Sequence, residues 1–421
     1  MKLAATRDGF GEGLVILGDK NPHVVVLCAD LTESTRADAF RKKFPNRFVE
    51  VGVAEQNLAG VASGMAAMGK IPFICSYATF SPGRNWEQIR TTIAYNQQPV
   101  KIVGAHAGIS VGPDGATHQA LEDVALMRVL PGMTVIVPCD AIEARKATVA
   151  AASINGPVYL RLGREKLPVI TKESDVFTAG TANVLRRGDA CAIVACGSLV
   201  HEALLAADVL KKEDISVTVI NSHTIKPLDR KTITESARAC GTVVVAEEHQ
   251  IAGGLGGAVA ELLSAFCPVP VRFIGIKDRF GESGTANELM RAFGLTHKEI
   301  ADAVRGLVRK QEMKCKELHE AETALAYNRK KLLEAPKPEL YFRTRSGESI
   351  RNIPHLKQAL KKMSDDVYSH HVTEHKNDFA MWIRDVFGDH ALADAIQHAR
   401  SKSNAEKEIA KVLRELYLKL P

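Results

Sequence analysis

The chain has 421 residues and a mass of 45.7 kDa, more than one ordinary domain holds, so roughly two to four domains are expected. With 46% hydrophobic and 25% charged residues, its composition excludes a wholly disordered or fibrous protein. The net charge of +6 is uneven, because residues 309–421 hold 22 Lys and Arg against 17 Asp and Glu and so carry +5 of it.

From residue 1 to about 308, short apolar β-branched runs alternate with longer amphipathic segments, the pattern of βα units around parallel sheets. The first series of predicted strands is His23–Cys28, Phe48–Val53, Pro99–Val103, Met133–Pro138 and Val158–Leu162. The second series is Cys191–Cys196, Ser216–Asn221, Gly241–Ala246 and Val271–Ile276. The turn-rich segment 165–188 between them predicts a domain joint, so we expect two α/β domains in tandem.

Residues 309–338 form a charged helical run that two prolines end, and we interpret them as a linker. Residues 339–421 begin with a short predicted strand and become mainly helical. Phe379, Trp382 and Ile383 stand at helical spacing there, a stripe that is typical of a core. The segment resembles an uncharacterised helical domain that is appended to other prokaryotic proteins.

Two histidines of this extension, His371 and His375, lie one turn apart if the segment is helical, which is the spacing of a metal-binding pair. Exposed or capping histidines are commoner than metal ligands at such positions. The basic excess of the extension is interspersed with acids, which favours a solvated surface over a nucleic-acid site.

No stretch reaches the ~20 uninterrupted apolar residues that a membrane span needs, so we expect no membrane partner. Arg7 and Asp8 stand where a signal peptide would have its apolar segment. None of the eight cysteines forms a C-x-x-C pair, which favours buried thiols in a reducing compartment. We therefore expect a soluble cytoplasmic protein.

Glu55 is the first candidate for chemistry. It follows the predicted strand Phe48–Val53 and begins a helix rich in Ala and Gly, at the crevice where open α/β sheets bind ligands. An acid at this position could also do no more than complement the helix dipole.

A second candidate segment follows the predicted strand Pro99–Val103. It places His106, a Gly-rich loop, Asp114 and His118 before the next helix. The three side chains share one pocket if the loop folds back, whereas the alternative makes both histidines structural. Gly108–Gly112 also fits the G-x-S-x-G nucleophile elbow, but Pro113 breaks the helix that a serine hydrolase requires there.

Three separated motifs resemble the thiamine-diphosphate enzyme transketolase: VGVAEQN, SYATF followed by GRNWEQIR, and AHAGISVGPDGATHQALED. The resemblance implies a pyrimidine-binding domain over 1–170 and a transketolase C-terminal domain over 171–308, two of that family's three domains. A linker (309–338) and a helical domain of unknown function (339–421) follow. The pattern is most similar to the C-terminal subunit of transketolases whose chain is split in two.

The resemblance also implies residue roles at the cofactor. Glu55 would bond N1′ of the aminopyrimidine of thiamine diphosphate, a task that suits a buried carboxyl whose environment favours its protonated form. Phe80 or Tyr77 would stack on the aminopyrimidine, and the spacing does not decide between the two rings.

The substrate residues are implied in the same way. His106, His118 and Asp114 would bind the hydroxyl groups of the donor sugar. The substrate phosphate would be bound by Arg7, Ser34 and Arg164.

The chain has no Gly-Asp-Gly motif, through which transketolases bind the cofactor diphosphate and Mg²⁺. The resemblance therefore implies an N-terminal partner subunit that supplies both, in a heterotetramer that self-associates through the pyrimidine-binding domains. The implied reaction moves a two-carbon ketol unit from a ketose phosphate to an aldose phosphate, as in the pentose phosphate pathway.

Three alternatives to this reading stay open. They are a 1-deoxyxylulose-5-phosphate synthase-like enzyme, another thiamine-diphosphate enzyme subunit, and a non-catalytic scaffold. His106 favours a transketolase over the first of them.

Overall fold

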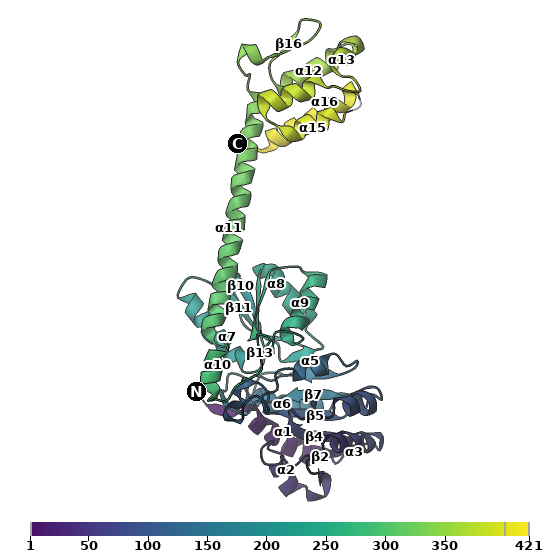
Figure 1. Ribbon diagram of the computed structural model, residues 1–421, viewed down its shortest axis with the longest axis vertical. Coiled ribbons are helices and arrows are strands. Elements are labelled where there is room, and N and C mark those ends of the chain that lie inside the picture. Colours follow the sequence, from purple (N-terminus) through teal and green to yellow (C-terminus); the bar gives the residue numbers. More distant parts are fainter. Residues whose placement is uncertain (1, 400, 420–421) are drawn as a thin grey trace. The chain divides into compact units, whose positions relative to one another are not determined.

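The computed structural model describes residues 2–399 and 401–419, without the side chains of 314, 315, 318–330, 418 and 419. It divides the chain into two compact units, Met1–Lys310 and Gln311–Pro421. Two sheets with their helices make up the first unit, and the second is mainly helical (Figure 1).

The first sheet has seven strands in the order β12-β6-β7-β5-β4-β2-β3, and all of them except β12 run parallel. The strands are β2 (Val24–Cys28), β3 (Phe48–Glu50), β4 (Ile71–Tyr77), β5 (Lys101–Ala105), β6 (Thr134–Ile136), β7 (Val158–Arg161) and β12 (Thr224–Lys226). The helical segments are α1 (Thr6–Lys20), α2 (Asp38–Lys43), η1 (Pro45–Arg47), α3 (Glu55–Ala67), α4 (Trp86–Gln88), η2 (Ile89–Ala94), η3 (Ile109–Asp114), α5 (Asp123–Arg128) and α6 (Ala141–Ala151).

Both faces of this sheet are covered, which explains the nearly continuous apolar runs of its strands. Val25 and Leu27 of β2 pack in one cluster with Leu58 of α3. The alternate residues Val24 and Val26 pack in another cluster with residues of α1 and α6. The sheet therefore holds the starts of α1 and α3 at fixed positions, where candidate residues lie.

The second sheet has five strands in the order β14-β13-β10-β11-β9, with only β9 antiparallel. The strands are β9 (Asn183–Arg186), β10 (Cys191–Ala195), β11 (Val217–Asn221), β13 (Val243–Gln250) and β14 (Val271–Ile276). The helices are α7 (Leu199–Lys211), α8 (Arg230–Cys240), α9 (Leu255–Phe266), α10 (Ala286–Ala292) and α11 (His297–Lys330). The predicted α/β class, with two parallel-dominated sheets and a helical C-terminal region, is confirmed.

The structure adds strands that the sequence reading left out. The largest is β4, a central strand whose second residue is Pro72. A proline without an N–H is tolerated so near a strand's start. The predicted joint 165–188 contains β9 and also β8 (Lys166–Pro168), which pairs with β1 (Leu3–Ala5).

The strand β12 joins the two domains of this unit. It lies in the chain between β11 and α8 of the second domain, yet it pairs antiparallel with β6 at the edge of the first sheet. The seven-stranded sheet of the first domain thus contains one strand from the second domain.

The second unit packs around its own apolar core, which includes Leu332, Ile350, Phe379 and Trp382. Its elements are η4 (Lys331–Leu333), η5 (Pro338–Leu340), the paired strands β15 (Phe342–Arg343) and β16 (Ser349–Ile350), α12 (Ile353–Lys362), α13 (Asp365–His371), α14 (Asp378–Trp382), η6 (Ile383–Phe387), α15 (His390–Gln397) and α16 (Lys402–Lys419). The predicted linker 309–338 falls on the later part of α11 and on η4.

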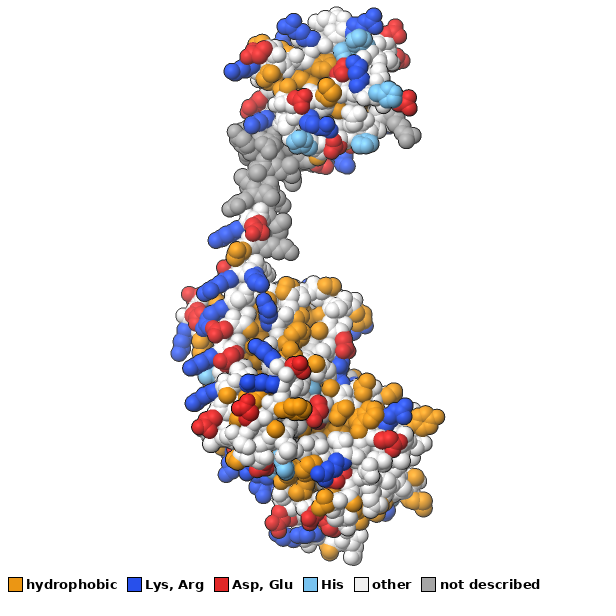
Figure 2. Space-filling model, viewed as in Figure 1, with side chains coloured by type: hydrophobic (Ala, Val, Ile, Leu, Met, Phe, Trp, Pro, Cys, Tyr) orange, Lys and Arg blue, Asp and Glu red, His pale blue; other side chains and the backbone are white. Residues whose placement is uncertain are grey.

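The helical spacing of His371 and His375 is not formed, because α13 ends at His371. Both ring nitrogens of His371 have protein partners: Nδ1 lies 3.1 Å from the Asp378 carboxylate, and Nε2 accepts the amide N–H of Arg345 at 3.0 Å. Figure 2 shows Lys and Arg interspersed with Asp and Glu over the visible face of this unit. None of the described helices combines the length and apolar character that crossing a bilayer requires.

Candidate active site

Glu55 is the first residue of α3, and its side chain is buried, with 4% of it exposed. Nη1 of Arg84 lies 3.2 Å from one carboxylate oxygen and 3.3 Å from the other. Asn85 donates from Nδ2 to the Glu55 backbone oxygen at 3.0 Å. Arg84 is thus an ion-pair partner of the buried Glu55 carboxyl.

An aromatic cluster lies beside this ion pair. The Arg84 guanidinium sits 4.1 Å from the centre of the Phe80 ring, which meets the His118 ring edge-on at 5.4 Å. Tyr77 stacks on His106 with 3.9 Å between ring centres and lies 5.9 Å from Phe80. The structure therefore brings four of the predicted residues into one cluster, next to Glu55.

The loop between His106 and His118 does fold back. Ala107 and Ala120 form a parallel bridge, and the Gly108 N–H donates to the Ala120 oxygen at 2.9 Å. The fold-back requires a left-handed backbone at Gly108, where φ is 91°, and His106 itself has a φ of 54°. This turn places both histidines on the same side of the loop as Tyr77.

His106 is buried beside cationic groups. Burial, and next the nearby Arg7 guanidinium, lower the pKa of His106 from 6.5 to about 3, so the ring is neutral at physiological pH. Arg7 Nη1 lies 3.1 Å from His106 Nε2, and because a guanidinium only donates, we assign the ring hydrogen to Nδ1. That buried Nδ1 has no hydrogen-bond partner among the described residues, which leaves a donor for a ligand.

The three residues predicted to bind phosphate lie around this imidazole. Arg7 donates to the backbone oxygen of Ser34 at 3.0 Å, so Ser34 contacts Arg7 through its main chain. Arg164 donates to the Asp114 carboxylate at 3.2 Å and to the Val111 oxygen at 2.8 Å. Asp114 is thus tied to Arg164, and both side chains are about a third exposed, at 34% and 31%.

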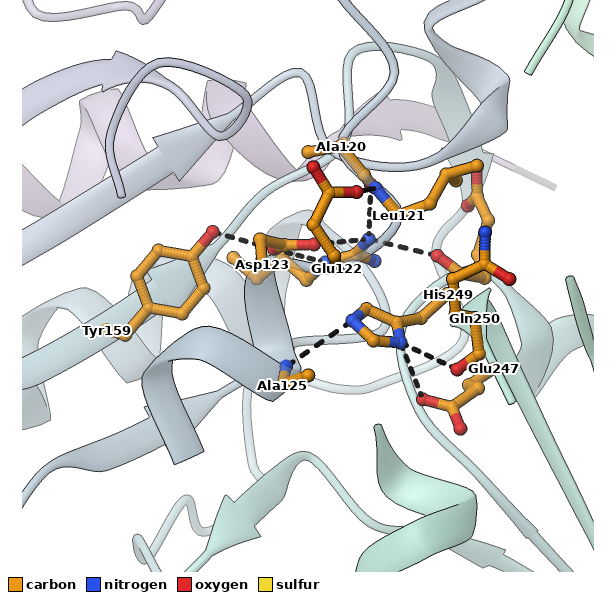
Figure 3. A network of polar contacts seen from close by, with 12 residues as sticks. Ala120, Leu121, Glu122, Asp123, Ala125, Tyr159, Glu247, His249 and Gln250 are labelled. Atoms are coloured by element: carbon orange, nitrogen blue, oxygen red, sulfur yellow. Dashed lines mark hydrogen bonds and ion pairs between the residues drawn. The ribbon is translucent and has the colours of Figure 1, made fainter. Parts of the chain in front are cut away.

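The sequence reading missed a buried ion pair that supports the loop. Arg161 donates to both oxygens of Asp123, at 2.8 and 3.1 Å. Figure 3 shows Tyr159, which donates to the same carboxylate at 2.7 Å. Burial alone would raise the pKa of Asp123, but the charge and hydrogen bonds of Arg161 outweigh it and lower that pKa. Arg161 also donates to the backbone oxygens of Ala120 and Glu248, at 3.2 and 2.9 Å. It therefore anchors the end of the loop between His106 and His118 to the second domain.

Two neighbouring residues of β13 extend this network. His249 donates from Nδ1 to the Gln250 oxygen at 2.7 Å, and its Nε2 accepts the Ala125 N–H at 3.4 Å (Figure 3). Glu247 accepts the first two amides of α9, at 2.7 Å each. These contacts hold the start of α9 and the helix α5 to β13.

The loop's serine is held by the second domain as well. The Ser110 N–H donates to Glu248 at 2.7 Å, and the Ser198 hydroxyl donates to the other oxygen at 2.6 Å. Ser110 lies within η3, a 3-10 segment interrupted at Gly112, and not before the helix that a nucleophile elbow requires. Within residues 2–399 and 401–419, no group of three or more His, Cys, Asp or Glu is placed to hold a metal ion.

Comparison with known proteins shows two family matches. Residues 2–169 match the transketolase pyrimidine-binding domain, and residues 180–300 match the transketolase C-terminal domain.

Curated relatives and a solved structure agree with these matches. The chain is 42% identical over 308 residues to a 6-deoxy-6-sulfo-D-fructose transketolase subunit of Clostridium sp. (strain MSTE9), covering 73% of this chain and 96% of that one. It is 37% identical over 309 residues to one of the subunits of an apulose-4-phosphate transketolase from Phocaeicola vulgatus, covering 73% and 99%. A solved structure described as "Split gene transketolase, inactive beta4 tetramer" is 48% identical to this chain, with a TM-score of 0.69. The match covers 72% of this chain and 98% of that one.

Proposed function

This chain belongs to the transketolase family, and we propose that it is the C-terminal subunit of a split transketolase. Together with an N-terminal partner, it transfers a two-carbon ketol unit from a ketose phosphate to an aldose phosphate. The observation that carries this proposal is the cluster in which Glu55, Phe80, His106 and His118 meet, although they come from three separate segments of the chain.

The residues around Glu55 fit the aminopyrimidine end of thiamine diphosphate. Bound there, the cofactor supplies a nucleophilic carbon and an electron sink. Glu55 would hold N1′ of the aminopyrimidine with its buried carboxyl. Oδ1 of Asn85 is a second buried acceptor next to it, with no hydrogen-bond partner in the described part of the chain.

Phe80 is the ring that we assign to stacking on the aminopyrimidine. One face of Tyr77 is already covered by His106 at 3.9 Å, so that ring packs within the protein. The cation above Phe80 belongs to Arg84, whose side chain is 51% exposed and would have to leave the ring and the Glu55 carboxyl when the cofactor binds. Phe80 therefore offers a flat apolar surface next to the carboxyl, and Tyr77 orients His106.

The donor sugar would occupy the space beside the two histidines. His106 offers its unpaired Nδ1–H to a hydroxyl or carbonyl oxygen, and its low pKa keeps it a neutral donor. His118 and Asp114 bind further hydroxyl groups from the returning part of the loop. Arg7 and Arg164 lie at the far end, where their charges suit the terminal phosphate.

A partner subunit completes the site. The chain lacks the Gly-Asp-Gly motif, so we assign binding of the diphosphate and Mg²⁺ to the N-terminal subunit. The solved relative described as a split-gene transketolase tetramer supports self-association of this kind of subunit. We propose a heterotetramer with two chains of each kind.

The test is reconstitution. The purified chain is mixed with its cognate N-terminal subunit, thiamine diphosphate and Mg²⁺, and ketol transfer from xylulose 5-phosphate to ribose 5-phosphate is measured. Transfer by the mixture and by neither subunit alone is expected. Formation of a complex that binds the cofactor yet transfers nothing would favour a non-catalytic scaffold.

A further inference from the structure

A third arginine, Arg36, lies close to Arg7 and His106, beyond the two arginines, Arg7 and Arg164, that we assign to the substrate phosphate. Arg36 closes a tight turn after Ser34 and has a left-handed backbone, with a φ of 68°. Its main chain packs directly on α1, because a Cβ atom added to Gly11 would lie only 2.7 Å from the backbone oxygen of Arg36. The turn is thereby fixed against the helix that carries Arg7.

The side chain of Arg36 is tethered next to Arg7. Its Nε donates to Asp8 at 2.7 Å, and Asp8 is the residue after Arg7 in α1. The other Asp8 oxygen accepts the Ala5 N–H at 3.2 Å, which holds the carboxylate at the start of the helix. The two terminal amino groups of Arg36 have no hydrogen bond in the described chain, and 44% of the side chain is exposed.

The charges of the three arginines act on one another. Burial lowers the pKa of Arg7 and the Arg36 guanidinium lowers it further. The pKa of His106 is lowered by burial, then by Arg7, Arg164 and Arg36. Arg7 makes its described hydrogen bonds only to uncharged groups, and its buried Nε has no partner among described atoms. Such a group of like charges is stabilised by an anion bound between them.

We propose that Arg36 is a specificity-determining residue, whose terminal amino groups contact the anionic end of the donor sugar and favour a phosphorylated donor over an uncharged one. This inference rests on the proposed ketol transfer. A phosphate monoester carries nearly two negative charges at neutral pH, so a further guanidinium beside Arg7 stabilises a phosphorylated donor and does nothing for an uncharged one.

The experiment compares two donors that have the same ketol head. Xylulose 5-phosphate ends in a phosphate, and erythrulose has no charged group. In the reconstituted complex, Arg36→Gln is expected to lower kcat/KM for xylulose 5-phosphate about tenfold, mainly through KM, and to leave erythrulose within about twofold. Arg36→Lys keeps the charge and should recover most of the loss.

The matched control is Arg41→Gln, an exposed arginine of α2 whose guanidinium lies 5.8 Å from the centre of the Phe48 ring. It should leave both donors unchanged. Equal losses with both donors would make Arg36 structural, and an unchanged KM for xylulose 5-phosphate would show that Arg36 does not contact the anion. Either result overturns the inference.

A binding measurement separates this inference from the proposed function. The assembled complex is titrated calorimetrically with ribose 5-phosphate and with ribose, and Arg36→Gln should weaken only the phosphorylated sugar. If that selective loss occurs in a complex without ketol transfer, the inference stands and the proposed function falls. If transfer is intact and the variant binds ribose 5-phosphate like the wild type, the inference falls alone.

Discussion

Arg84 reaches the buried carboxyl of Glu55 from the surface of the protein, with 3.2 Å between Nη1 of Arg84 and Oε1 of Glu55. The Arg84 side chain is 51% exposed, whereas the Glu55 side chain is 4% exposed. Removing Arg84 leaves a buried carboxylate without its ion-pair partner. Because Arg84 is half exposed and water screens the pair, Arg84→Gln should lower the free energy of unfolding of the free chain by about 1 kcal/mol. Urea unfolding at pH 7 measures this. Arg84→Lys should recover part of the loss, and Arg90→Gln, at an exposed arginine of the same segment, should cause none.

Glu55→Gln should abolish ketol transfer, by at least about a hundredfold in kcat, because the amide fills the same space but cannot exchange a proton at N1′ of the cofactor. Assembly with the partner should be nearly unchanged in gel filtration. Glu87→Gln, at an exposed acid of α4, is the matched control and should keep full activity. Substantial activity in Glu55→Gln would remove Glu55 from its proposed role.

The low pKa of His106 gives a pH dependence of stability with a definite sign. The pKa is about 3 in the folded chain and 6.5 in the unfolded one, so between these values only the unfolded state takes up the proton. Stability should therefore fall as the pH drops below 6.5, and His106→Gln should make this slope shallower. Nitrogen NMR of the ring should show a neutral imidazole down to about pH 4. A ring that titrates near pH 6.5 would contradict the burial argument.

Lys101 gives a second pH dependence, on the alkaline side. This fully buried side chain donates to the Ile154 and Gly156 oxygens at 2.7 and 2.8 Å, and burial lowers its pKa from 10.5 to about 7. Between pH 7 and 10.5 the unfolded state binds the proton and the folded state releases it, so this residue makes stability rise with pH in that window. Urea unfolding at pH 7, 8 and 9 should show a smaller rise in Lys101→Met, whereas the exposed Lys42→Met should behave like the wild type.

Truncation after Lys310 should leave ketol transfer within about twofold of the full chain. Ile300, Val304 and Leu307 of α11 pack into the second domain's core and are retained, whereas Leu332 belongs to the core of the second unit. Gel filtration and the reconstituted assay measure the outcome. Loss of folded, active complex would show that the second unit is needed by the catalytic part.

Most of the parallel strands could be predicted because each is a short apolar run buried on both sides. The strand β4 was missed because Pro72 speaks against a central strand, and local sequence does not show that it stands near the strand's start. The strand β12 was missed because it has three residues, and its pairing with β6 depends on the packing of two domains. Such long-range pairing has no local signature.

The candidate site was predictable where residues match a motif, as for Glu55 and His106. Arg84 stood inside the quoted segment GRNWEQIR but received no role, because its contact with Glu55 spans 29 positions. Arg161 is one of three arginines in 161–186, and the sequence does not reveal which one is buried against Asp123. Ion pairs between distant residues become visible only in the folded chain.

The seven-stranded sheet, with its one strand from the second domain, also affects how the chain folds during synthesis. The parallel strands of the first sheet are complete at Arg161, but β12 ends at Lys226, about 65 residues later. At ~5–20 residues per second, a ribosome needs roughly 3–13 seconds to make that stretch. Until then the edge of β6 lacks its partner strand and can pair with other nascent chains. The yield of folded subunit should therefore depend on translation speed between the two strands, and on chaperones that cover this edge.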